Sequence, residues 1–263
     1  MLRTAPARLL TFPTEAHRRA ADAAVAFLRT LRDVDAVVVV GSAARRTDAN
    51  DLDLCALVAD GATAARVEER FEEFAAGSPE LLALRKLGPF VECDLHALDG
   101  EFAPGPRGWT SGPEPFELDI GNEVAYSVPL WERNDHYRRL RERWLPYYGD
   151  DLRTARLEEA RMYCVNDIDH VPVMVGRDEP FHAFHRLYLA FQEFLQCVFI
   201  ARRTYPIAYD KWIREQVEGL LGLPELYAVL PSLIGVAGLD GAAIARNAER
   251  LRDLLDTWAP SER

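Results

Sequence analysis

Four residues early in the chain have the types and spacing of a site for a metal ion and a phosphate group. Gly41 and Ser42 directly follow a run of four valines, and Asp51 and Asp53 come after a further short stretch. Side chains in a strand alternate between its two faces, so residues two apart point the same way. Asp51 and Asp53 would then present two carboxylates on one face, about 7 Å apart at their Cα atoms. Such a pair suits Mg²⁺, which takes one or two carboxylates and completes its shell with phosphate and water.

The elements that position these residues follow from their neighbours in the sequence. Residues 35–40 favour a strand, because branched valine side chains fit a pleated surface, and residues 51–58 predict a second one. Gly41 lets the backbone turn sharply and approach a ligand closely. Residues 42–46 are predicted to form the first turn of a short helix, whose free N–H groups would face a bound anion. The order of a strand, a turn, a helix and a second strand is a more specific signal than the Gly-Ser or the Asp-x-Asp motif alone.

A third strand, predicted at residues 90–97, supplies two further carboxylates, Glu92 and Asp94. Alternation places both acids on one face and the apolar Val91, Cys93 and Leu95 on the other. The apolar face is expected to be packed, and the acidic face is expected to open to a cleft. Two-metal phosphoryl transfer commonly uses a third carboxylate to hold a metal or to take the proton of the acceptor.

This arrangement resembles the nucleotidyltransferases of the DNA polymerase beta superfamily, and in particular the small antibiotic (aminoglycoside) type. That type has the pattern Gly-Ser-x-Ala-Arg-Gly, followed by Ser-Asp-x-Asp. Gly41, Ser42, Ala44 and Arg45 fit the pattern, whereas Arg46 and Asn50 stand where the family usually has Gly and Ser. The match is specific up to about residue 60 and weaker beyond it. The resemblance implies an α/β (α+β) nucleotidyltransferase domain with a short mixed sheet, followed by an all-α helical bundle.

The resemblance also implies an activity and a set of roles. The reaction would be a Mg²⁺-dependent transfer of a nucleoside monophosphate, with ATP or another nucleoside triphosphate as the donor. Two Mg²⁺ ions would bind Asp51, Asp53 and a third acid. The family has an acid between two apolar residues on the third strand, and this pattern fits Glu92 best and Asp94 next. Gly41, Ser42 and Arg45 would bind the nucleotide.

A second segment of the resemblance lies far along the chain. Residues 205–212, Tyr-Pro-Ile-Ala-Tyr-Asp-Lys-Trp, are similar to the family's Tyr-x-x-Lys-Trp element, which follows a long helix. The resemblance implies that Lys211 reaches the triphosphate and that Tyr209 helps to position the nucleotide. Lys211 stands out because the chain contains only one other lysine, Lys86.

Hydrophobic periodicity divides the chain into residues 1–128 and residues 129–263. Helices are predicted at 14–33 and 62–76 in the first part, and at 153–164, 181–203, 210–221 and 242–258 in the second. Residues 99–115 are rich in glycine and proline and contain Trp109, which makes them a loop and a candidate lid over the site. Asp99, Glu101, Glu114 and Glu117 are expected near the rim of that site.

Composition limits the function further. The net charge is −11, which argues against a nucleic-acid ligand and suits a small cationic acceptor that bears a hydroxyl group. The four cysteines are widely spaced in apolar segments and are expected to be free thiols of a reducing compartment. Neither a signal peptide nor a membrane span is expected, so the predicted location is the cytoplasm.

Several motifs are interpreted as structural, and two other functions stay open. Asp167 and Asp169 lack a preceding Gly-Ser turn and are interpreted as a solvated segment, while His182 and His185 are interpreted as ordinary helix residues. One alternative function is nucleotidylation of a protein or of tRNA, for which the arginines of residues 138–143 would supply a basic patch. The other is a non-catalytic nucleotide-binding module of the same fold.

Overall fold

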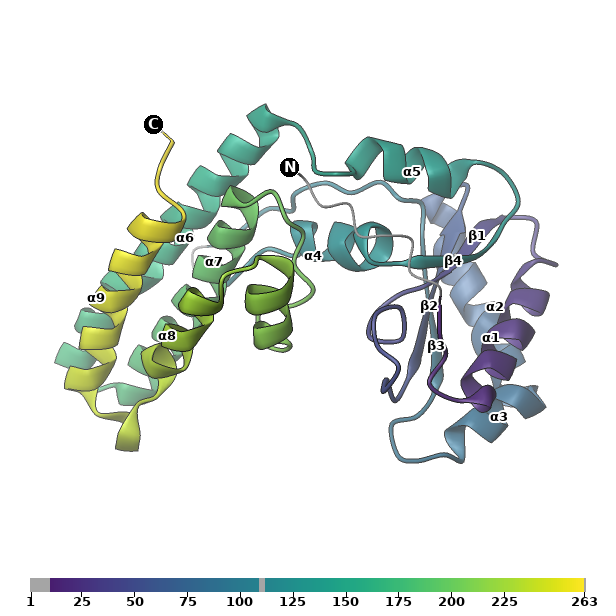
Figure 1. Ribbon diagram of the computed structural model, residues 1–263, viewed down its shortest axis with the longest axis horizontal. Coiled ribbons are helices and arrows are strands. Elements are labelled where there is room, and N and C mark those ends of the chain that lie inside the picture. The colour runs from purple at the N-terminus through teal and green to yellow at the C-terminus, as the bar shows by residue number, and fades with distance from the viewer. Residues whose placement is uncertain (1–9, 109–111, 263) are drawn as a thin grey trace. The chain divides into compact units, whose positions relative to one another are not determined.

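The computed structural model describes residues 10–108 and 112–262, and the chain forms two compact units (Figure 1). One unit comprises residues 1–103 and 119–146, and the other comprises residues 104–118 and 147–263. The chain therefore passes between the units more than once, in contrast to the single boundary after residue 128 that the sequence suggests. The reason is that Glu114 and Glu117 are buried in the helical unit, where both pair with Arg156. Trp109, within the predicted lid, lies outside the described residues.

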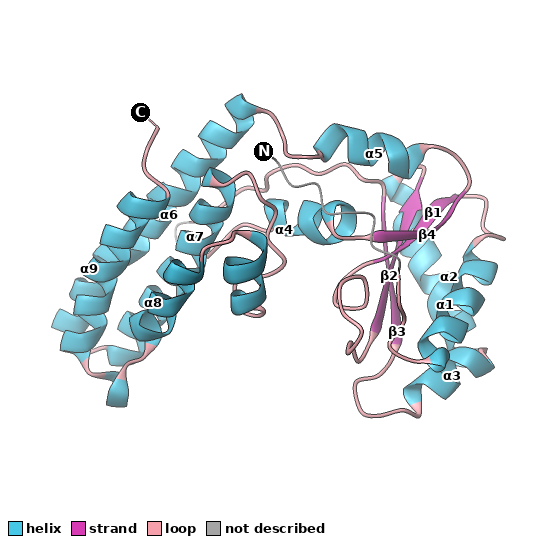
Figure 2. Cartoon of the chain, in the orientation of Figure 1, coloured by secondary structure: helices cyan, strands magenta, loops and turns pink. Residues whose placement is uncertain are grey.

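The first unit is built on a mixed sheet with the strand order β3-β2-β1-β4. The strands are β1 (Val34–Val39), β2 (Leu52–Val58), β3 (Cys93–Leu98) and β4 (Val128–Glu132). β1 runs antiparallel to both β2 and β4, whereas β2 and β3 are parallel. Figure 2 shows the four strands with helices α1 (Glu15–Leu28), α2 (Ala64–Gly77) and α3 (Pro79–Arg85) beside them. Helix α5 (His136–Trp144) follows β4 in the chain.

The core of this unit explains why these segments adopt their structures. All six residues of β1 are buried, as expected for a central strand. Alternate residues of β1 and β2, including Val37, Val39, Leu52 and Leu54, join the small residues of α1 in one hydrophobic cluster. At the start of α1 the Thr14 side chain accepts a hydrogen bond from the backbone N–H of His17, which is the N-cap arrangement.

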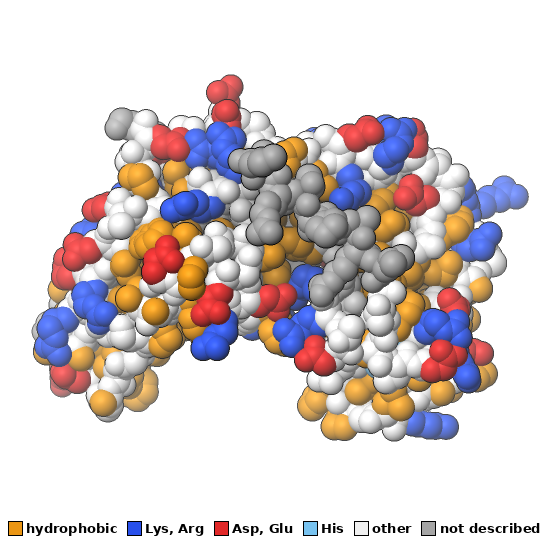
Figure 3. Space-filling model, in the orientation of Figure 1, with side chains coloured by type: hydrophobic (Ala, Val, Ile, Leu, Met, Phe, Trp, Pro, Cys, Tyr) orange, Lys and Arg blue, Asp and Glu red, His pale blue; other side chains and the backbone are white. Residues whose placement is uncertain are grey.

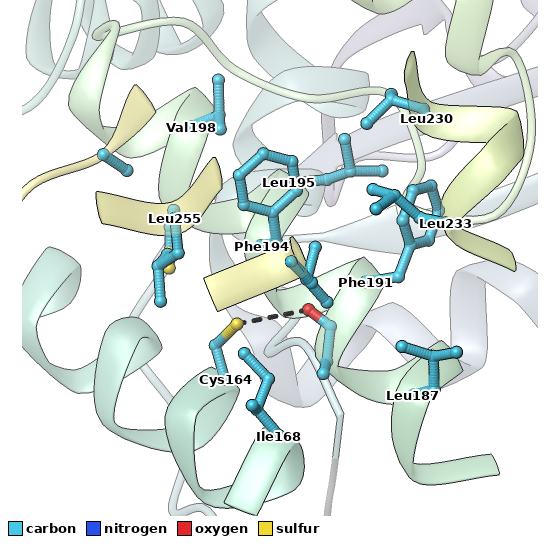
Figure 4. Close-up of a cluster of buried hydrophobic side chains, with 14 of the residues drawn as sticks. Cys164, Ile168, Leu187, Phe191, Phe194, Leu195, Val198, Leu230, Leu233 and Leu255 are labelled. Atoms are coloured by element: carbon cyan, nitrogen blue, oxygen red, sulfur yellow. Dashed lines mark hydrogen bonds between the residues drawn. The ribbon is translucent and has the colours of Figure 1, made fainter. Parts of the chain in front are cut away.

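The second unit consists of helices packed around one hydrophobic core. Its main helices are α6 (Asp150–Gly176), α7 (Pro180–Ala201), α8 (Pro224–Ile234) and α9 (Gly241–Trp258), and the short α4 (Phe116–Ile120) ends the segment that leads back to the first unit. Figure 4 shows Phe191, Phe194 and Leu195 of α7 within this core. The Cys164 thiol of α6 donates a hydrogen bond to the Ala190 carbonyl of α7, at 3.3 Å.

The predicted fold class, a small mixed sheet followed by helices, is confirmed, although several elements differ from the prediction. α6 continues well beyond residue 164, and the helix predicted at 210–221 is a loop followed by the π-helix Glu215–Leu220. All four cysteines are free and buried, as predicted. None of the helices within the described residues is both long and apolar enough to cross a membrane.

Candidate active site

The Gly-Ser turn lies directly against an Asp53 carboxylate oxygen. After β1, the backbone N–H of Val40 donates a hydrogen bond to the Asp53 carbonyl at 2.9 Å, which keeps the chain beside β2. Gly41 then adopts a φ of +62°, and a Cβ atom at this position would lie only 2.2 Å from Oδ2 of Asp53. The Cβ atom of any other residue would clash with that carboxylate, and the left-handed conformation would also be energetically unfavourable for that residue. Glycine is therefore required for this close approach.

The residues after Gly41 form one hydrogen-bonded turn rather than the predicted short helix. The backbone N–H groups of Arg45 and Arg46 both donate to the Ser42 carbonyl, at 3.0 and 2.9 Å. The turn goes no further because the chain has to return within a few residues to begin β2 at Leu52. The Arg45 guanidinium is buried and donates to the Gly41 carbonyl at 3.0 Å, so it supports the turn. The Ser42 hydroxyl donates to Asp51 Oδ1 at 3.4 Å.

The register between β2 and β3 places Asp94 directly opposite Asp53. Partners on neighbouring strands point to the same face and lie about 5 Å apart at their backbones, so the Asp53 and Asp94 side chains extend from the same face of the sheet. Partial burial raises the pKa of Asp94, and the neighbouring Glu92 and Asp51 carboxylates raise it further, whereas Arg85 lowers it. The site thus concentrates negative charge, which favours a bound cation.

Glu92 lies outside β3, in contrast to the predicted strand at 90–97. Phe90 has a φ of +65° and is exposed, so the extended conformation begins only at Cys93. The Glu92 carbonyl accepts a hydrogen bond from the Leu52 N–H at 2.8 Å, while its half-exposed side chain lies 3.8 Å from Arg85. Sequence reasoning missed Arg85, because α3 was not predicted as a separate helix.

Lys211 and Tyr209 both belong to the helical unit, but they differ in how far they are buried. Lys211 is exposed and has no carboxylate partner among the residues that the structure describes. Tyr209 is buried in the core of the unit, and burial raises its pKa well above the usual range. A nucleotide contact by Tyr209 does not fit this position.

Two other acidic pairs were assigned incorrectly from the sequence. Glu114 and Glu117 are buried ion-pair partners of Arg156 rather than rim residues. Asp167 is also buried, and it pairs with Arg186 at 2.5 Å, whereas Asp169 is exposed and pairs with Arg252. The solvated interpretation fails for Asp167 because α6 continues through this segment, and residues two apart on a helix face different directions.

The donor set fits Mg²⁺ bound together with a phosphate ligand. Within residues 10–108 and 112–262, no group of three histidine, cysteine or acidic side chains is arranged to hold a metal by itself. Mg²⁺ does not require such a group, because one or two carboxylates with substrate phosphates and water complete its shell. The Gly41 backbone lies against the Asp53 carboxylate, which places the turn that follows Gly41 beside that carboxylate.

Comparison with known proteins adds distant structural similarity. The chain matches no family model and no curated protein. A solved structure described as a nucleotidyltransferase-like protein from Exiguobacterium sibiricum 255-15 aligns with 92% of this chain and 74% of that chain. The identity is 13% and the TM-score 0.49. Similarity at this level assigns neither a family nor an activity, so the function has to be argued from the residues.

Proposed function

We propose that this protein is a Mg²⁺-dependent nucleotidyltransferase that transfers a nucleoside monophosphate, with ATP as the preferred donor, to a hydroxyl group. The proposal rests on one observation, which is that the Gly41 turn lies against Asp53 while Asp94 stands opposite Asp53 in the sheet. Phosphate-binding backbone and adjacent carboxylates are what a metal-bound triphosphate needs.

Each residue then has a proposed role. Asp51 and Asp53 would hold Mg²⁺, which supplies charge neutralisation and Lewis acidity at the phosphates. Ser42 and the backbone N–H groups of the turn would bind the β- and γ-phosphates. Asp94 would take the proton from the acceptor hydroxyl, whose oxygen attacks the α-phosphorus as the bond to pyrophosphate breaks. Asp94 is preferred to Glu92 as this base because of its register with Asp53.

The acceptor that fits best is a small cationic molecule with a hydroxyl group, such as an aminoglycoside. A net charge of −11 and adjacent carboxylates at the site attract cations. The predicted basic patch is largely neutralised, since Arg138 pairs with Asp135 and Glu142, and Arg143 pairs with Glu101. On the face drawn in Figure 3, described basic and acidic side chains are interspersed, which does not favour tRNA as the acceptor.

Isothermal titration with ATP, with and without Mg²⁺, tests the site. The wild-type protein should bind ATP only with the metal, and the Asp51→Ala/Asp53→Ala variant should lose this binding because the metal ligands are gone. Asp22→Ala is the control, since Asp22 is an exposed aspartate on α1 that pairs with Arg18. Metal-dependent binding of wild-type strength by the double variant would refute the site.

A further inference from the structure

A groove of about 710 Å³ lies between strand β4 and helix α5, which are both labelled in Figure 1. We call it the β4–α5 groove. Its lining comes from residues within 127–132 and 137–146, all of which belong to the first unit and none of which has a role in the proposed site. Sites for small ligands commonly have volumes of about 300–1,000 Å³, so this groove is large enough for a small organic molecule.

Most of the surface of the groove is apolar. Val128 and Pro129 of β4 contribute to it, as do Leu145 and Pro146 directly after α5. β4 is the last strand in the order β3-β2-β1-β4, so among the described residues no further strand covers its outer edge. The apolar surface would stabilise a ligand by removing the apolar atoms of that ligand from water.

Arg141 is the polar residue of the groove that can select a ligand by charge. Its Nη1 donates to the Val124 carbonyl at 2.8 Å and to the Tyr137 hydroxyl at 3.2 Å, so the guanidinium is held in place from one side. Its Nε and Nη2 have no hydrogen-bond or carboxylate partner in the part of the chain that the structure describes. The N–H bonds on these two nitrogens form the side of a guanidinium that binds a carboxylate or phosphate through two parallel hydrogen bonds.

The other charged side chains of the groove do not neutralise Arg141. Arg138 and Glu142 pair with each other, and Arg138 also pairs with Asp135. Glu132 is exposed, and within residues 10–108 and 112–262 no hydrogen bond or ion pair fixes its side chain. A side chain that is already held loses less entropy on binding than a mobile one, so Arg141 rather than Glu132 should determine the charge of the ligand.

We propose that the β4–α5 groove binds a small amphipathic anion. The carboxylate or phosphate group of this ligand pairs with Nε and Nη2 of Arg141, and its apolar part lies against Val128, Pro129 and Leu145. The inference does not depend on the proposed function, because the two sites use different residues. A purely structural Arg141 would only hold the segment before β4 through Val124, and it would give the groove no preference for anions.

Titration calorimetry with four probes that share one hydrocarbon chain tests this preference. The probes are octanoate, octyl phosphate, octanol and octylamine. At least one of the two anions should bind roughly 10-fold or more tightly than octanol, as expected for charge-assisted hydrogen bonds, and octylamine should bind most weakly. The ranking of octanoate and octyl phosphate distinguishes a carboxylate ligand from a phosphate ligand. Hexanoate should bind roughly 10-fold more weakly than octanoate, because two fewer CH₂ groups are removed from water.

Three variants locate the binding in the groove. Arg141→Gln should reduce the affinity for the anions to that for octanol, whereas Arg141→Lys keeps a cation and should retain part of the preference. Pro129→Phe should weaken the binding of every probe, because Pro129 is an exposed residue of the lining and a larger side chain would fill the groove. Arg139→Gln is the control, since Arg139 is an exposed arginine of the same helix that pairs with Asp135 outside the groove.

Several results would overturn the inference. These are binding of octanol as tight as that of both anions, no binding of any probe, unchanged anion affinity in Arg141→Gln, and an equal loss in Arg139→Gln. If Arg141→Gln does not fold, unchanged affinity in Pro129→Phe would overturn it. Competition between octanoate and ATP with Mg²⁺ would assign Arg141 to the nucleotide and overturn a separate ligand. A wild-type protein that binds octanoate but no ATP would refute the proposed function and leave this inference intact.

Discussion

The contact between Gly41 and Asp53 makes a single glycine essential to the proposed site. Gly41→Ala would place a methyl group 2.2 Å from the Asp53 carboxylate and would retain the cost of a positive φ. We expect stability to fall by ~1–2 kcal/mol and metal-dependent ATP binding to be lost, because the carboxylate has to move. Gly77→Ala is the matched control, since a Cβ there meets nothing within 4 Å. Thermal unfolding and titration calorimetry measure both effects, and an intact ATP affinity in Gly41→Ala would contradict the close-approach argument.

The third carboxylate can be identified by comparing two conservative substitutions. Asp94→Asn removes the carboxylate that stands opposite Asp53, and we expect pyrophosphate release to fall ~100-fold or more, as for the loss of a general base. Glu92→Gln removes a half-exposed carboxylate near Arg85, and turnover should stay close to that of the wild type. The opposite ranking would assign the role to Glu92, as the sequence pattern suggests.

The residues of the candidate site show which spatial relationships the sequence predicts and which it does not. Gly41, Ser42, Asp51 and Asp53 are close in sequence, so the local pattern of strand and turn is enough to relate them. The choice between Glu92 and Asp94 depends on where β3 begins and on its register with β2. Both are consequences of tertiary packing, and Phe90 gives no sequence signal of its positive φ.

At the scale of elements, α6 and α7 share a buried group of charged residues, Asp167, Arg186, Glu193 and Arg107. Arg186 pairs with Asp167 at 2.5 Å, and Arg107 pairs with Glu193 at 3.1 Å. The Arg107 guanidinium also lies 3.9 Å from the centre of the Tyr163 ring. Arg107 comes from the segment 104–118, so this group joins that segment to the helices. In the buried Asp167–Arg186 pair both charges lose their hydration, and the attraction between them offsets that cost only in part.

This group should make the stability of the helical unit depend on pH. Burial, and then the nearby Asp167 carboxylate, raise the pKa of Glu193 from its ordinary value of 4.5 to about 8. The folded state therefore keeps a proton that the unfolded state releases, so the free energy of unfolding should fall as pH rises from about 4.5 to about 8. In Glu193→Gln this part of the pH dependence should disappear. Urea unfolding at several pH values measures it, with Glu225→Gln on the exposed start of α8 as the control. Equal pH profiles for Glu193→Gln and the wild type would contradict this assignment.

The sequence predicts where helices occur better than it predicts the residues at which they end. The apolar stripe of α7 is periodic, so its sequence predicts the helix within a few residues. α6 is different, because Asp167, Asp169 and Pro172 interrupt the pattern although the helix continues to Gly176. Burial of Asp167 against Arg186 compensates for the polar residue in the core, and this pairing of residues distant in sequence has no local signal. Residues 205–209 are likewise buried outside any helix, and the Gln216 side chain bonds there to the backbone of Ile207 and Ala208, a contact that periodicity does not predict.

At the scale of the whole molecule, charge is the property that bears on the acceptor. The chain has a net charge of −11, and the arginines of α5 are largely neutralised by nearby acids. A polyanion such as tRNA would be repelled at long range, whereas a small polycation would be attracted, and both effects weaken as salt screens them. The preference for an acceptor and the dependence of that preference on ionic strength therefore both test whether the negative charge of the protein selects the acceptor.

We expect pyrophosphate release from ATP and Mg²⁺ with a hydroxyl-bearing polyamine acceptor, and none with bulk tRNA. A panel of aminoglycosides, a lincosamide and tRNA, assayed at low and at high salt, measures this. With the preferred acceptor, kcat/KM should fall as salt increases, because screening removes the attraction between a cation and the acidic site. The Asp94→Asn variant provides the background rate for each acceptor. Turnover with tRNA alone would establish the nucleic-acid alternative. ATP binding without turnover on any acceptor in the panel would favour the non-catalytic module, and a salt-independent kcat/KM would remove charge as the basis of acceptor choice.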